Sequence, residues 1–207
     1  MLEFTKGEGK LLNSLKTPAR VQDYINSIPF NFEKDGIDVL KSPIRVLREN
    51  NAHCIEGAIL AAYILSLHGY DPLLLHLEAK KNGKVKDYDH VVAPFCVEGL
   101  WGAISKTNHA VLRYREPVYR DIRELAMSYF HEYFTDDGKK TLRKYSATLN
   151  LNEFENTWPC EEGDLWGIDE ELDKIEHFEI VSKSLIKKLR IADSIEREAG
   201  KITEYAL

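Results

Sequence analysis

The sequence predicts an α+β fold, in which an antiparallel sheet packs on one buried helix and a helical layer is added at the C-terminal end. Three observations predict it. Residues 54–68 (CIEGAILAAYILSLH) are apolar on nearly every helical face, as in a helix that is buried on most sides. Three short apolar segments follow, separated by the turn signals Asn82-Gly83 and Glu98-Gly99. Beyond residue 108, apolar residues return at helical spacing.

The chain has 207 residues, which fits one domain of generous size. We expect a loosely held lead-in over residues 1–16, a core over 17–108 and a mainly helical extension over 109–207. Within the core, Thr17-Pro18 and Ser42-Pro43 each offer an N-cap residue followed by Pro at the first helical position. Each pair therefore predicts the start of a short helix before the buried one.

The predicted strands are Leu73–Leu77, Tyr88–Phe95 and Leu100–Ile104. Each is short and apolar, and neighbouring strands are joined by turn residues, so they should pair as antiparallel neighbours. Helical spacing then predicts helices over residues 117–134 and roughly 170–198, whereas 139–168 show no clean periodicity.

Charge and hydropathy argue against nucleic acid and membrane as partners. The formal net charge is −6 and no cluster of Lys and Arg stands out, so we expect no nucleic-acid binding. No apolar stretch is long enough for a signal peptide or a membrane span, so we expect a soluble, cytoplasmic protein without membrane contact. No cofactor or metal is expected, and the oligomeric state is left open.

The three cysteines are Cys54, Cys96 and Cys160. An odd count at wide spacing argues against a disulfide framework, and the absence of a CxxC pair argues against a cysteine-based zinc site. We expect reduced thiols, with Cys96 and Cys160 as core and loop residues.

Cys54 opens the buried helix, directly after the breaker Asn50-Asn51. The unpaired N–H groups and the dipole at a helix start favour a thiolate, and the same N–H groups can stabilise an oxyanion. Glu56 adds an opposing negative charge to the first turn, unless it faces away as a partner of the helix dipole.

A thiolate nucleophile needs a base from elsewhere in the fold. His90 stands at the head of a buried strand, where a polar ring needs a partner, and Cys54 is the candidate. His53 adjoins Cys54 but is expected outside the helix start, with poor geometry. Asp89 should point to the face of the strand opposite His90.

The order of a Cys at a helix start, a strand, Asp-His-Val-Val on the next strand and a Trp-containing third strand resembles the transglutaminase-like group of papain-like cysteine enzymes. Residues 42–108 carry the resemblance. It implies that Cys54 attacks an acyl or amide carbonyl, that His90 is the general base, and that an Asp or Asn on the next strand orients the His.

The residue expected to orient His90 departs from that pattern. Ser105 occupies the place of the acid, at the end of Trp101-Gly102-Ala103-Ile104-Ser105 and 15 residues after His90. A hydroxyl can orient an imidazole but supplies no negative charge. Asn108 is the alternative, because an amide carbonyl can do the same orienting work.

Three functions remain open. The first is a hydrolase or acyltransferase acting on an amide, ester or thioester of a peptide or small-molecule acyl substrate. The second is a catalytically weak or inactive binding or scaffold protein of the same fold, in which Cys54 is a small core residue. The third is a metal site formed by His53, Cys54 and His90, for which adjacent ligands give poor geometry.

Overall fold

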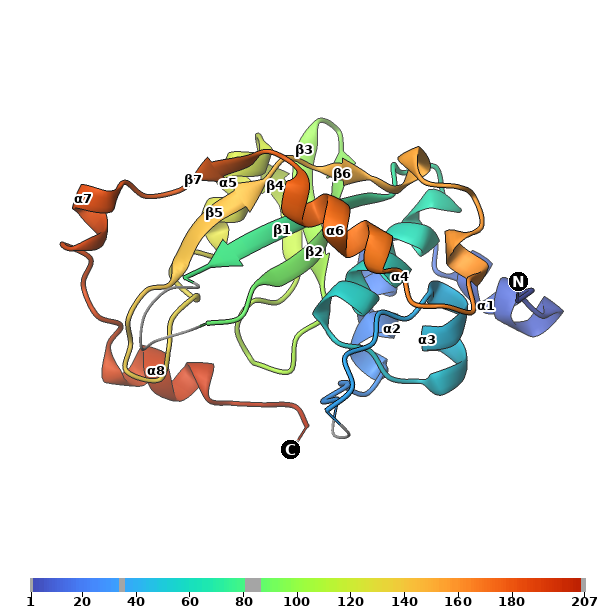
Figure 1. Cartoon of the computed structure of the whole chain (residues 1–207), viewed down its shortest axis with the longest axis horizontal. Helices are drawn as coiled ribbons and strands as arrows, with labels where there is room; N and C mark the ends of the chain where they lie inside the picture. Colours follow the sequence, from blue (N-terminus) through green and yellow to red (C-terminus); the bar gives the residue numbers. More distant parts are fainter. Residues whose placement is uncertain (1, 34–35, 81–86, 206–207) are drawn as a thin grey trace.

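The computed structural model describes residues 2–33, 36–80 and 87–205 (Figure 1). The described elements, in chain order, are α1 (Lys6–Ser14), α2 (Pro18–Ser27), α3 (Pro43–Glu49), α4 (Cys54–Ser66), β1 (Leu73–Ala79), β2 (His90–Val97), β3 (Leu100–Ser105), β4 (Arg115–Tyr119), α5 (Ile122–Ser128), β5 (Leu142–Ser146), β6 (Leu149–Asn150), two 3₁₀ turns η1 (Leu151–Glu153) and η2 (Trp158–Cys160), α6 (Trp166–Lys174), β7 (His177–Glu179), α7 (Lys183–Ile186) and α8 (Ser194–Gly200).

The helices before the sheet start where the capping residues predict. Thr17 accepts a hydrogen bond from the Arg20 N–H at the start of α2, and Pro43 opens α3. The prediction of a loosely held lead-in over residues 1–16 is wrong, because residues 6–14 form the helix α1. Thr5 and Glu8 make a capping box there, which offsets the low helix propensity of two glycines, and α1 buries Leu12 in the core.

Helix α4 is the centre of the N-terminal half, as its apolar sequence predicts. Every residue from Ile55 to Ala62 is buried. Gly57 allows the close approach that the site needs, because a Cβ at this position would lie 2.4 Å from the Cβ of Lys106. The start of α4 is therefore held against the chain that leaves the end of β3.

The sheet is larger than predicted. Among the described residues it has seven antiparallel strands, in the order β4-β3-β2-β1-β5-β7, with β6 pairing the start of β1. The predicted middle strands are confirmed: Leu77 pairs with His90 between β1 and β2, and Val92 pairs with Ser105 between β2 and β3. The predicted Asn82-Gly83 turn lies outside the described residues.

The predicted helical extension is incomplete, because this part of the chain contains the helices α5, α6, α7 and α8 but also adds four strands to the sheet. Arg115–Tyr119, expected at the start of a helix, is the edge strand β4 beside β3, and the helix α5 starts only after Asp121 caps it. Likewise β7 (His177–Glu179) interrupts the predicted last helix by pairing with β5. Backbone pairing with distant strands outweighs local helical spacing here.

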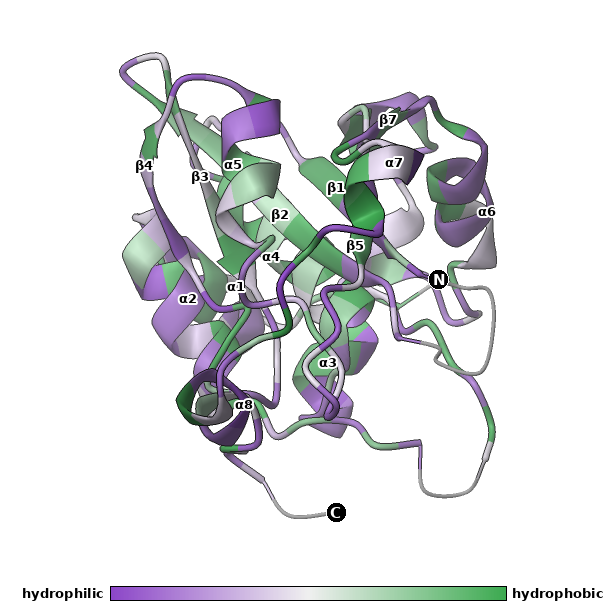
Figure 2. Cartoon of the chain, turned by 90° about the vertical axis from the view of Figure 1, so that its left-hand side faces the viewer, coloured by the Kyte–Doolittle hydropathy of each residue, from purple (hydrophilic) through white to green (hydrophobic). Residues whose placement is uncertain are grey.

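The sheet separates two hydrophobic clusters. Alternate residues of a strand point to opposite faces. Leu74 and Val91 accordingly pack with α4, whereas Leu75 and Val92 pack with α5. Figure 2 shows β1 and β2 as the hydrophobic centre, with hydrophilic residues on outer helices such as α6.

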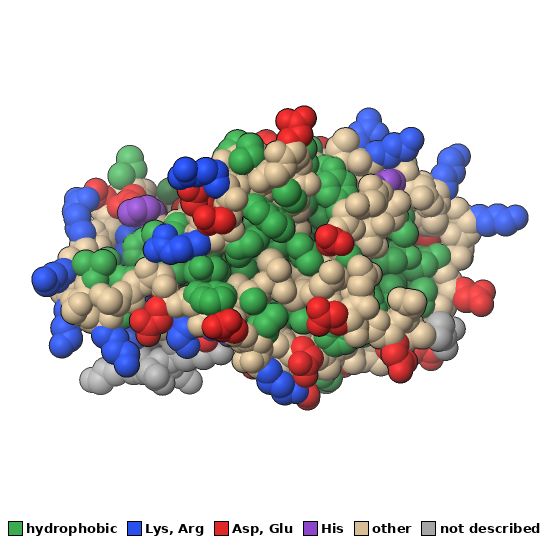
Figure 3. All heavy atoms as spheres, turned by 90° about the horizontal axis from the view of Figure 1, so that it is seen from above, with side chains coloured by type: hydrophobic (Ala, Val, Ile, Leu, Met, Phe, Trp, Pro, Cys, Tyr) green, Lys and Arg blue, Asp and Glu red, His purple; other side chains and the backbone are tan. Residues whose placement is uncertain are grey.

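The face of the molecule drawn in Figure 3 carries acidic and basic side chains intermixed around small hydrophobic areas. Such mixing gives this face no field of a single sign. In the described part of the chain, no helix has the length and apolar character needed to cross a bilayer.

Candidate active site

Cys54 is the first residue of α4 and is partly exposed. Its sulfur is hydrogen-bonded by two imidazoles, those of His53 and His90. The first N–H groups of a helix have no partner within it, so the thiol also faces the positive end of the α4 dipole. The structure thus places the two predicted residues Cys54 and His90 in contact, although 35 residues lie between them in the sequence.

The far side of the His90 ring meets Ser105. The distance from His90 Nε2 to Ser105 Oγ is 2.8 Å, and the same hydroxyl donates its hydrogen to the Leu112 carbonyl at 2.5 Å. A hydroxyl has one hydrogen, so Ser105 Oγ accepts from His90, and the Nε2 atom must carry a proton. The Nδ1 atom of His90 is therefore the nitrogen that faces the thiol.

Ser105 is itself clamped by Gln22, a buried residue of α2. The Gln22 amide accepts from the Ser105 N–H at 2.9 Å and donates to the Ser105 carbonyl at 2.9 Å. Sequence reasoning missed this residue. Its signal was an amide on the apolar side of a helix, beside Val21 and Ile25, where a buried polar group must find a partner.

The structure does not bring Asn108 to His90. The Asn108 side chain donates to the Tyr205 carbonyl at 3.0 Å and accepts from the Tyr205 N–H at 2.9 Å. Both of its polar atoms therefore hold the C-terminal segment of the described chain. Of the two alternatives for the third position, Ser105 is the one that contacts the His90 ring.

His53 lies just outside the helix, as expected, because it is the N-cap residue of α4. The expected poor geometry is wrong, since its ring interacts with Cys54. Glu56 turns back toward it: the Glu56 carboxylate accepts from the His53 N–H at 2.9 Å and lies 3.7 Å from the His53 Nε2 atom. The signal in the sequence was the spacing of His53 and Glu56, which is that of a capping box.

Glu56 is fully buried, and its carboxylate lies between two groups that can be positively charged, Lys41 and His53. It lies 3.7 Å from the Lys41 ammonium and accepts from the Lys41 N–H at 3.0 Å. A buried carboxylate needs partners of this kind. Glu56 therefore does not oppose the thiolate, because its charge supports His53 and the start of the helix.

The electrostatics of the pair follow from these contacts. Burial alone would raise the pKa of the Cys54 thiol, but hydrogen bonds from His53 and His90 hold that pKa well below its usual range. Burial opposes a charged His53 ring, yet its hydrogen bond to Cys54 and the nearby Glu56 charge raise the pKa of His53 to about 9. The site thus favours a thiolate beside an imidazolium at neutral pH.

The other cysteines lack this environment. Cys96 is exposed on β2, so the expectation that it belongs to the core is wrong. Cys160 is half-buried in η2, and burial raises the pKa of its thiol. Asp89 is bound on the face away from His90: it accepts from the Ala79 N–H at 2.8 Å and lies 3.2 Å from His76 Nε2.

A metal site receives no support from the arrangement. Within the described ranges, no group of three or more His, Cys, Asp and Glu side chains has a geometry that could hold a metal ion. The contacts of His53, Cys54 and His90 are those of hydrogen-bonded partners, which suits acid–base and nucleophilic chemistry.

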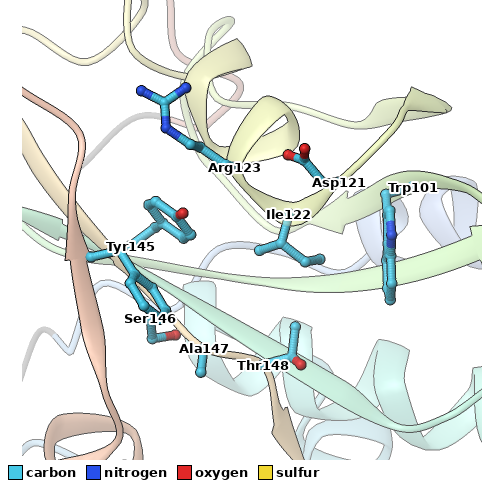
Figure 4. Close-up of a pocket in the computed structure, with 9 residues that line it drawn as sticks. Trp101, Asp121, Ile122, Arg123, Tyr145, Ser146, Ala147 and Thr148 are labelled. Atoms are coloured by element: carbon cyan, nitrogen blue, oxygen red, sulfur yellow. The ribbon is translucent and has the colours of Figure 1, made fainter.

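Two hollows lie on the described surface near the sheet and α4. One, of about 480 Å³, is lined by Trp101, Ile122 and Tyr145 among others, and it contains neither cysteine nor histidine (Figure 4). The other, of about 210 Å³, is bordered by His53 and Trp166. The smaller hollow adjoins the thiol site, whereas the larger one holds no nucleophile–base pair.

No known family model and no curated protein matches the sequence. Among solved structures, the chain is similar to Legionella pneumophila LapG, with 16% identity and a TM-score of 0.45, over 81% of this chain and 85% of that one. The EGTA-treated form of Legionella pneumophila LapG gives 15% identity and a TM-score of 0.44, over 81% and 86% of the two chains.

Proposed function

We propose that this protein is a cysteine-dependent hydrolase or acyltransferase, in which the Cys54 thiolate attacks the carbonyl of an amide, ester or thioester. One observation carries the proposal: Cys54 lies at the start of a buried helix and is hydrogen-bonded by two imidazoles, which lower its pKa. A thiol prepared in this way is the reactive kind, whereas a structural cysteine is inert.

The first step is acylation. Cys54 ionises by passing its proton to the Nδ1 atom of His90, and the resulting thiolate forms a bond to the carbonyl carbon while the carbonyl π electrons move to the oxygen. N–H groups at the start of α4 stabilise this oxyanion. When it collapses, the bond to the leaving group breaks and His90 returns the proton to that group.

The second step releases the acyl group from Cys54. His90 takes a proton from water, or from another acyl acceptor, as that nucleophile bonds to the thioester carbon and the carbonyl π electrons move to oxygen. When this oxyanion collapses, the carbon–sulfur bond breaks and its electron pair leaves on Cys54 as the thiolate. Throughout both steps, the hydrogen bond from His90 Nε2 to Ser105 keeps the Nδ1 atom turned toward the sulfur. Gln22 holds Ser105 in place for this contact. Ser105 and Gln22 are positioning residues in this scheme, and the acyl acceptor decides between hydrolysis and transfer.

The experiment uses p-nitrophenyl acetate, an activated ester that is small enough to reach the partly exposed Cys54 thiol. We expect a burst of p-nitrophenolate stoichiometric with protein, and one acetyl group on Cys54 by peptide mass spectrometry. The Cys54→Ser variant should lose the burst, and the matched Cys160→Ser variant should keep it. Equal acetylation in all three proteins would contradict the proposal.

A second candidate is a binding protein that keeps the fold without turnover. It is favoured by Ser105, because a hydroxyl supplies no charge to stabilise an imidazolium at His90. It predicts that the Cys54→Ser protein folds normally and reacts with the ester as the wild type does. The burst experiment therefore separates the two candidates.

A further inference from the structure

The two imidazoles at Cys54 have different surroundings. Behind His90 stands the neutral hydroxyl of Ser105. Behind His53 stand two carboxylates: the distance from His53 Nε2 is 3.5 Å to Glu33 Oε1 and 3.7 Å to Glu56 Oε2. Carboxylates favour the charged form of an imidazole, and a hydroxyl does so far less. The negative charge that is missing behind His90 is thus found behind the other ring.

The contacts of His53 also define its protons. Its Nε2 atom lies 2.9 Å from the Val39 carbonyl oxygen, which can only accept, so Nε2 carries a hydrogen. The ring nitrogen left for the sulfur of Cys54 is Nδ1. When the ring is charged, Nδ1 also carries a hydrogen and donates it to the thiolate, so all the polar atoms of His53 are used at once.

Other charged groups near His53 act in the same direction. Asp38 and Asp169 line the small hollow that His53 borders. Lys41 is the nearby cation, and it lies 3.7 Å from both Glu56 and Glu49, so carboxylates also surround it. Carboxylates from α4, from the chain before it and from α6 therefore lie in contact with His53 or line the hollow that it borders.

We propose that His53 is a second catalytic histidine, which stays protonated through the reaction and stabilises the Cys54 thiolate, while His90 alone exchanges protons. The inference rests on the proposed function and divides its acid–base work between two rings. His53 supplies charge, backed by Glu33 and Glu56. His90 supplies a movable proton, and Ser105 only orients it.

The division keeps each step balanced. Ionisation of Cys54 leaves its proton on His90 Nδ1 before the attack. The thiolate then forms the sulfur–carbon bond as the carbonyl π electrons move to oxygen, and His90 gives its proton to the leaving atom as the bond to it breaks. His53 gains and loses no proton. As the sulfur loses its charge on attack, Glu33 and Glu56 keep the His53 ring compensated.

The test is the rate at which iodoacetamide alkylates Cys54 as a function of pH, followed by peptide mass spectrometry on the full chain. The main variant is His53→Asn, because Asn is a favourable N-cap residue and should leave α4 intact. The matched control is His68→Asn, just beyond the other end of the same helix, where Nε2 of the ring lies 3.2 Å from the Leu12 carbonyl oxygen.

At about pH 6, we expect alkylation of Cys54 to be at least ~10-fold slower in His53→Asn than in the wild type, since fewer thiols are ionised. At about pH 10.5 the two rates should agree within roughly twofold, because all thiols are then ionised. The control should match the wild type throughout. A His53→Asn rate within roughly twofold of the wild type at about pH 6 would overturn the role of His53.

Glu33→Gln gives a second reading that does not depend on the start of α4. Glu33 lies in the loop before α3, and removing its charge should slow alkylation at about pH 6 by roughly 2- to 5-fold. An unchanged rate would count against the carboxylate backing. Slow labelling of Cys54 in the wild type itself would instead overturn the proposed function, so the two failures are distinguishable.

Discussion

The two sides of Cys54 are built in opposite ways. On the helix side, His53 and Glu56 lie within three residues of the thiol, and charged groups back the imidazole. On the sheet side, His90, Ser105 and Gln22 come from β2, β3 and α2, and the side chains that hydrogen-bond behind the ring, Ser105 and Gln22, are neutral. The helix side supplies charge, and the sheet side supplies geometry and a transferable proton.

The difference shows why a serine can stand where an acid is expected. An imidazole that must be both oriented and charged needs a carboxylate partner. When a second imidazole carries the charge, the first needs only orientation, which Ser105 Oγ provides at 2.8 Å. Removing the groups on each side should therefore have unequal effects on the reaction.

The largest effect is expected from His90→Ala. It removes the group that moves the proton, so the p-nitrophenolate burst rate should fall by about 10²- to 10⁴-fold. The matched control is His109→Ala, whose ring bonds the Gly200 carbonyl away from Cys54 and should leave the burst unchanged. A loss below roughly threefold in His90→Ala would mean that His53 is the base instead.

The next effect is on the titration of His53. Its imidazole nitrogens, followed by ¹⁵N NMR, should both stay protonated at neutral pH, and the ring should lose a proton only near about 9. In Cys54→Ala the thiolate partner is absent, so the pKa should fall by about one unit or more. A His53 that titrates at the same pH with and without the thiol would show that the two groups do not interact.

The interaction of His53 with Cys54 also predicts how the free energy of unfolding changes with pH. The pKa of His53 is raised in the folded state to about 9, so its contribution to the free energy of unfolding is complete below the ordinary histidine pKa and is lost as the pH rises through about 9. His53→Asn should remove that loss. Urea unfolding of both proteins across this range measures it, and parallel pH profiles would contradict the expectation.

A smaller effect is expected from Ser105→Ala, which removes the acceptor for His90 Nε2. One neutral hydrogen bond is worth about 1 kcal/mol, so the burst rate should fall by roughly 10-fold at most. Ser27→Ala, in which the lost hydroxyl bonds only the nearby Tyr24 carbonyl, is the matched control. If Ser105→Ala matched His90→Ala in its loss, orientation alone would not explain the role of the serine.

The smallest effect on the reaction is expected from Asn108→Ala. Its amide makes two hydrogen bonds to the Tyr205 backbone, so the free energy of unfolding should drop by about 1–2 kcal/mol. The burst rate should stay within roughly twofold of the wild type, since the ring of His90 contacts Ser105. A loss of activity equal to that of Ser105→Ala would restore Asn108 as the orienting residue.

The sequence predicts the secondary structure well where local signals, such as capping residues and apolar spacing, determine it. Capping residues give the starts of α2 and α3, and apolar continuity gives α4. It fails where pairing partners are remote: β5 pairs with β1, and β7 with β5, over stretches whose own spacing is ambiguous. Strand propensity depends on such neighbours, so no local pattern could place these strands.

The same division holds at the site. Cys54 and His90, with Ser105 or Asn108 as the third residue, could be named in advance because the order of their motifs resembles that of a known group of cysteine enzymes. The strand register accounts for Ser105 rather than Asn108: Val92 pairs with Ser105, two residues beyond His90. The contact of His53 with Cys54 was not expected, because adjacent residues rarely have the geometry for one; here His53 is the N-cap residue, and Glu56 accepts from its backbone N–H. Gln22 was missed because it reaches Ser105 from 83 residues away.

The central claim is that Cys54 is a thiolate at neutral pH, and the most direct measurement is the alkylation rate of all three cysteines against pH in the wild-type chain. Cys54 should label near its maximal rate at about pH 6, far faster than Cys160, whose thiol has a pKa raised by burial. A Cys54 rate that climbs only around the free-thiol value of about 8.5, or that never exceeds the rate of exposed Cys96, would contradict the account.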